Sequence, residues 1–63
     1  MRDLADYFSI GRIAREMINF DEDGALDNAR ERADEEARVG NAAAAERWRA
    51  IADTIERMRP PVN

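Results

Sequence analysis

Apolar positions recur at helical spacing in three stretches of the chain. The C-terminal stretch is the most regular, because its apolar residues are spaced 4, 3, 4 and 3 apart, as on one face of an α-helix. These positions are Ala44, Trp48, Ile51, Ile55 and Met58. The middle stretch has a stripe of mostly small residues: Leu26, Ala29, Ala33 and Ala37. The pattern therefore predicts two helices, at about 25–39 and 42–59.

Two residues between these stretches suit the end of one helix and the start of the next. Gly40 favours the left-handed conformation that often follows a last helical residue. Asn41 is a good N-cap, because its side-chain oxygen can accept a hydrogen bond from a free N–H of the new helix. The two helices should therefore form an antiparallel hairpin.

The position of the turn predicts the register of this hairpin. If the chain folds back at Gly40 and Asn41, Ala33 faces Trp48, so that a small residue meets a large one and the helices can lie close together. Trp48 is then either a core residue or an interface anchor. The residues with a predicted structural role are Ala33, Gly40, Asn41, Trp48, Ile51 and Ile55.

The N-terminal stretch, at about 3–19, has a broader apolar band. A helix with this pattern is apolar over more of its circumference than one contact surface requires. One surface should cover the hairpin, and the other should contact a partner. The predicted partner-interface residues are Leu4, Tyr7, Phe8, Ile10, Ile13 and Met17. Gly11 lies inside this helix and indicates either a close helix crossing or a kink.

The length predicts one small domain, residues 1–63, and the apolar pattern predicts that it is all-α with three helices. Residues 60–63 should form a loose tail after the last helix. A chain of 63 residues is near the lower limit for independent folding. It has no cysteine, so it has no disulfide. Association into a homodimer, or with another partner, is the expected source of further stability. Whether the first helix packs on its own hairpin or swaps onto a neighbour stays open.

The charge distribution argues against several classes of partner. The chain is acidic, with a formal net charge of −4, and residues 21–38 hold eight acids against three arginines. A nucleic-acid binder would instead need a basic face. The apolar runs are shorter than the ~18 residues of a membrane span, and the start of the sequence lacks a signal-peptide pattern. We expect a cytoplasmic protein that binds neither nucleic acid nor membranes.

The segment Asn19–Asp27 partly matches a calcium-binding loop. Counted from Asn19, amide and carboxylate side chains occupy positions 1, 3 and 5, and Gly24 occupies position 6. Position 12, however, should be a bidentate glutamate and is Arg30. We therefore predict an interhelical turn with no metal and no cofactor, although binding of a cation by this segment stays open.

The residue types also argue against catalysis. The chain has no cysteine, histidine or lysine, and its hydroxyl groups are those of Tyr7, Ser9 and Thr54. Nucleophilic and Schiff-base mechanisms therefore lack their usual residues. Three short helices are also not expected to enclose a pocket of ~300 Å³. We predict no catalytic residue.

A resemblance adds a fold and a source, but no activity. The matching features are Arg-Ala-Asp-Glu at 32–35, the Gly40-Asn41 turn, Trp48, Ile51, Ile55 and Glu56. They resemble a group of small uncharacterised bacterial proteins, which usually have Asp in place of Asn41. The resemblance covers about residues 22–58 and implies a helical fold and a bacterial source.

Two functions fit these observations. The first is a non-enzymatic protein-interaction or regulatory module that self-associates, or docks on another protein, through an apolar helix face. The alternative is an acidic mimic of nucleic acid that occupies a DNA-binding protein through the segment from Asp21 to Glu36. Arg30 and Arg32 interrupt that acidic segment and weaken the second hypothesis.

Overall fold

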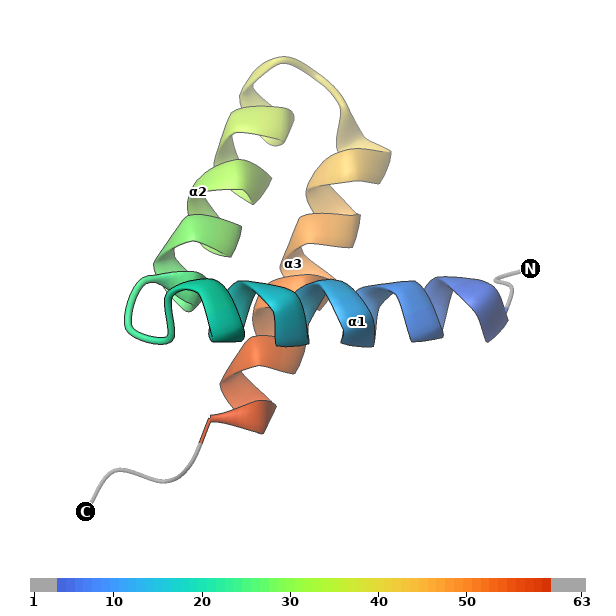
Figure 1. Ribbon diagram of the computed structural model, residues 1–63. Helices are drawn as coiled ribbons and strands as arrows, with labels where there is room; N and C mark the ends of the chain where they lie inside the picture. The colour runs from blue at the N-terminus through green and yellow to red at the C-terminus, as the bar shows by residue number, and fades with distance from the viewer. Residues whose placement is uncertain (1–3, 60–63) are drawn as a thin grey trace.

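The computed structural model describes the backbone of residues 4–59 and the side chains of residues 9–59. Three α-helices make up this part of the chain (Figure 1): α1 at Leu4–Phe20, α2 at Ala25–Arg38 and α3 at Ala42–Met58. The all-α fold with a C-terminal hairpin is confirmed, and each helix end lies within one residue of its predicted position. The predicted tail at 60–63 lies outside the described residues.

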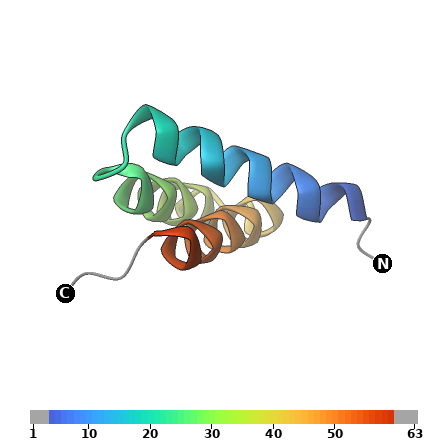
Figure 2. The same ribbon diagram turned by 60° about the horizontal axis from the view of Figure 1, so that its bottom comes forward.

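The three helices form a hairpin with one helix across it. Helices α2 and α3 run antiparallel and contact each other most, while α1 packs mainly on α3 and less on α2. Figures 1 and 2 show α1 crossing the hairpin, with its N-terminal end extending beyond α3. In this structure α1 therefore packs on the hairpin of its own chain.

The turn between α2 and α3 depends on Gly40 and Asn41. Gly40 has a positive φ of 83°, a conformation that costs other residues more than glycine. The Asn41 side-chain oxygen accepts a hydrogen bond from the backbone N–H of Ala44 at 3.3 Å. The Asn41 amide also donates to Oε2 of Glu36 at 3.0 Å, which links the end of α2 to the start of α3. These contacts fix the point at which the chain reverses.

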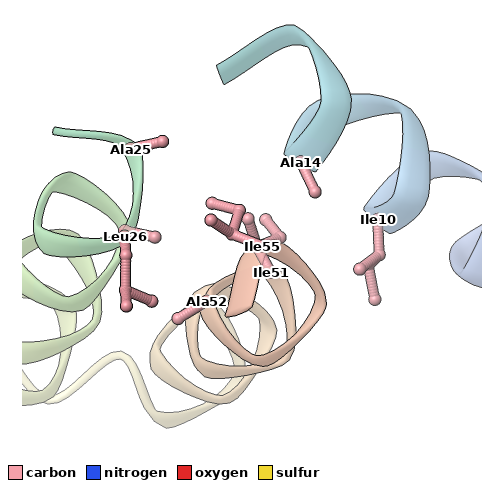
Figure 3. Close-up of a cluster of buried hydrophobic side chains, with 8 residues drawn as sticks. Ile10, Ala14, Ala25, Leu26, Ile51, Ala52 and Ile55 are labelled. Carbon is pink, nitrogen blue, oxygen red and sulfur yellow. The ribbon is translucent and has the colours of Figure 1, made fainter. Parts of the chain in front are cut away.

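Buried side chains from all three helices form the core (Figure 3). Its cluster comprises Ile10 and Ala14 of α1, Ala25, Leu26 and Ala29 of α2, and Ile51, Ala52 and Ile55 of α3. Ile51 and Ile55 are the largest fully buried side chains, and both belong to α3. Alanines beside them let the helices approach closely. Helix α3 is therefore the central element of the core.

The buried face of α3 differs from the predicted one. Ala45 and Ala52 are buried, whereas Trp48 is only half-buried and Met58 is 39% exposed. The prediction assumed a seam between two helices, but α3 contacts both α1 and α2 and so buries a wider arc. At the far end of α2, Ala37 is exposed, so its predicted place in the seam is wrong.

Gly11 does not mark a close helix crossing. Helix α1 continues through it, and a Cβ atom built at this position would meet no neighbouring atom within 4 Å. The expectation of a close crossing is therefore wrong, and glycine at this position adds flexibility to the unfolded chain.

We expect Gly11→Ala to stabilise the protein by about 0.5–1 kcal/mol, because alanine favours the helix and has room here. Chemical denaturation followed by circular dichroism measures this change. Gly40→Ala is the control and should destabilise the protein, because the φ of Gly40 is 83°. A loss of stability in the Gly11 variant would contradict the open environment of that residue.

Candidate functional site

An open groove lies between the C-terminal part of α1 and the hairpin of α2 and α3. Its volume is about 480 Å³. The lining residues are Ile13, Glu16, Met17, Phe20, Asp21, Gly24, Ala25, Asn28, Arg32 and Trp48. Three short helices thus form a larger hollow than we expected, because the crossing of α1 over the hairpin leaves a solvent-open corner beside Trp48.

Helix α1 supplies the apolar wall of the groove. Ile13 and Met17 are half-buried and pack against the core, whereas Phe20 is 92% exposed. Phe20 ends α1, and the backbone N–H of Asp21 donates to the Met17 carbonyl at 3.0 Å as the chain turns away. Phe20 therefore projects from the rim of the groove with little protein around it.

Trp48 forms the inner wall, with a cation stacked on it. The guanidinium carbon of Arg32 lies 5.0 Å from the centroid of the Trp48 ring, which is within range of a cation–π interaction. The Arg32 Nε–H donates to the Asn28 side-chain oxygen at 2.9 Å, which holds the guanidinium in place. The residue that stacks on Trp48 is thus Arg32, next in sequence to the predicted partner Ala33, which is buried.

Two carboxylates lie among the lining residues of the groove. Glu16 and Asp21 are both exposed, and neither forms an ion pair within the described part of the chain. The Asp21 side chain accepts a hydrogen bond from the backbone N–H of Gly24 at 3.2 Å. A Cβ atom on Gly24 would collide with that carboxylate, so glycine leaves the space that Asp21 needs to close the turn.

The segment that partly matches a calcium-binding loop, Asn19–Asp27, contains this interhelical turn. Asn19, the first expected ligand, belongs to α1, which continues to Phe20 before the turn begins. Among residues 9–59, no group of three or more acidic side chains is placed to hold a metal ion. The acids at 21–23 instead precede α2, where the helix dipole favours negative charge.

The predicted interface residues fall into three groups. Ile13 and Met17 line the groove, whereas Ile10 is buried in the core and is not exposed in the single chain. The side chains of Leu4, Tyr7 and Phe8 lie outside the described residues. Phe20 was not among the predicted interface residues, because the sequence pattern placed it in the interhelical turn. Its position three residues after Met17, on the same helix face, was the available signal.

A second hollow on another part of the hairpin is smaller and charged. Its volume is about 320 Å³, and its lining residues are Arg30, Ala33, Asp34, Arg49, Ala52 and Asp53. The lining contains no large apolar side chain, and its charges balance. Nearby, Arg30 forms an exposed ion pair with Glu56 at 3.8 Å, a kind that contributes little stability. Substitutions in this second hollow therefore serve as controls for substitutions in the apolar groove.

The chain matches no family model, and no curated protein or solved structure is similar to it at a significant level. The resemblance noted from the sequence therefore stays an expectation. Within residues 4–59, no helix has the length and apolar character needed to cross a membrane.

We expect Arg32→Ala to expose Trp48, because it removes the guanidinium stacked on the ring. Trp48 is the only tryptophan, so fluorescence quenching by acrylamide reports its accessibility directly. Quenching should increase, and the free energy of unfolding should fall by about 0.5–1 kcal/mol. Arg49→Ala is the matched control, because Arg49 lines the second hollow. Equal quenching in both variants would show that Arg32 does not cover Trp48 in solution.

Proposed function

We propose that this chain is a non-enzymatic protein-interaction module that docks a protein surface in the groove beside Trp48. The exposure of Phe20 is the observation that carries the proposal: a large aromatic side chain, 92% exposed, lies at the rim of a groove lined by Ile13, Met17 and Trp48. Four large apolar side chains thus meet at one surface.

The energetics favour an occupant for this surface. Moving a phenylalanine side chain from water into an apolar contact contributes about 1.5–3 kcal/mol. Aromatic residues at the centre of a contact surface commonly supply most of the binding energy. The half-buried Trp48 offers such a residue on a fixed helix, and Phe20 offers a second one that the fold itself leaves in water.

The lining of the groove supports binding rather than catalysis. It contains no serine, threonine, cysteine, histidine or lysine, so the usual nucleophiles and neutral-pH bases do not line it. Its polar side chains are those of Glu16, Asp21, Asn28 and Arg32. These groups suit recognition of a charged or polar surface around an apolar contact.

The alternative, a mimic of nucleic acid, has less support. Two arginines of the acidic region neutralise neighbouring acids: Arg38 pairs with Glu35 at 2.9 Å, and Arg30 pairs with Glu56 at 3.8 Å. A continuous negative surface is what a DNA-binding protein would require, and these pairs interrupt it. Docking through the apolar groove accounts for Phe20, which mimicry does not use.

Phe20→Ser tests the proposal, with Val39→Ser as the matched control, because Val39 is 67% exposed and lies outside the groove. Each protein is immobilised, and the proteins that it retains from a lysate of the source cell are compared at low and high salt. We expect the wild type and the Val39 variant to retain the same protein at both salt concentrations, and the Phe20 variant to lose it. Apolar contacts resist salt, whereas exposed charge pairs are screened.

Two results would contradict docking through the groove. One is that the Phe20 variant still retains the same protein from the lysate, since the contact would then lie elsewhere on the molecule. The other is retention that disappears at high salt in the wild type, which is the behaviour expected of nucleic-acid mimicry.

A further inference from the structure

We propose that the occupant of the groove is a second copy of this chain, bound across a two-fold axis. This inference rests on the proposed docking function of the groove and names its partner. A two-fold contact uses the same surface on both copies, so that surface must be complementary to itself in shape, apolar character and charge. The groove meets this requirement in two respects.

The first respect is charge. The groove carries charges of both signs, the carboxylates of Glu16 and Asp21 and the guanidinium of Arg32. Within the described residues, none of the three forms an ion pair. Arg32 uses Nε to bind Asn28, which leaves its two terminal nitrogens available for a carboxylate.

These charges lie at different places along the groove. Asp21 lies in the turn before α2, whereas Arg32 follows Ala25, the first residue of α2, by seven positions. At 1.5 Å per residue, that separation is about 10 Å along the helix. A two-fold axis midway between them would therefore bring Asp21 of one copy to Arg32 of the other, and the same contact would form twice.

The second respect is the apolar surface. Phe20 projects from the rim with 92% exposure and cannot be buried by its own helix, which ends there. A second copy would cover it with Ile13, Met17 and Trp48, and would place its own Phe20 on the equivalent surface of the first copy. Each copy thus supplies both the projecting side chain and the surface that receives it.

The size of the domain gives a reason for this association. Half of the core cluster consists of alanines, which bury little apolar surface each. Domains near 60 residues are marginally stable, and association often adds the missing burial. The second hollow also carries both signs of charge, but it lacks an exposed large apolar residue, so the groove is the better candidate for the contact.

A charge-swap experiment tests the pairing. One variant carries Arg32→Glu, and the other carries Glu16→Arg together with Asp21→Arg. Light scattering measures the mass of each variant alone and of an equal mixture, with circular dichroism to verify that each is helical. Arg49→Glu, and Asp34→Arg with Asp53→Arg, make the same changes at the second hollow and serve as controls.

We expect the wild type and both controls to have the mass of a dimer. Each groove variant alone should dissociate about tenfold or more readily, because like charges then face each other. The mixture should recover the dimer, because both contacts in the mixed pair again join opposite charges. A mixture that stays monomeric, or groove variants that dimerise as well as the controls, would overturn the two-fold pairing.

Failure of this inference differs from failure of the proposed function. The wild type could be monomeric at high concentration while Phe20→Ser still abolishes retention of another protein. That result would overturn the second copy as the occupant and leave docking through the groove intact. If neither Phe20→Ser nor the charge changes affect the dimer, and Phe20→Ser loses no retained protein, both the two-fold pairing and docking through the groove are overturned.

Discussion

The burial of Ile51 and Ile55 is the contact on which the rest of the structure depends. Both side chains are fully buried and belong to α3, the helix that contacts both of the others. Alanines of α1 and α2 face them, which lets α1 cross the hairpin closely. That crossing creates the open corner beside Trp48. The groove is therefore a direct consequence of how α1 packs over these two isoleucines.

The sequence predicted the helices well because their ends depend on local interactions. Gly40 supplies the positive φ, and Asn41 caps the first turn of α3, so both ends of the hairpin turn could be assigned from single residues. The spacing of Ile51 and Ile55 likewise identified the centre of the buried face of α3, although Trp48 and Met58 on the predicted face are less buried. These features require no knowledge of how the third helix packs.

The candidate site was less predictable, because it depends on contacts between distant residues. The direction in which α1 crosses decides which of its apolar side chains are buried: Ile10 enters the core, while Ile13 and Met17 line the groove. The prediction treated all three alike, since helical spacing alone does not distinguish them. The stacking of Arg32 on Trp48 is also a contact between two helices. The predicted register paired small apolar residues with large ones and so did not consider a charged partner for Trp48.

Several residues that line the groove also stabilise the fold, because Ile13, Met17 and Trp48 all pack against the core. Trp48 lies on the same face of α3 as Ile51 and Ile55 and packs against their cluster, and it also lines the groove. A substitution of Trp48 therefore alters stability and binding together. Phe20 ends α1 and is almost fully exposed, so the core does not depend on it. Docking can therefore be measured separately from stability at Phe20, whereas a loss of binding on changing Trp48 would have two explanations.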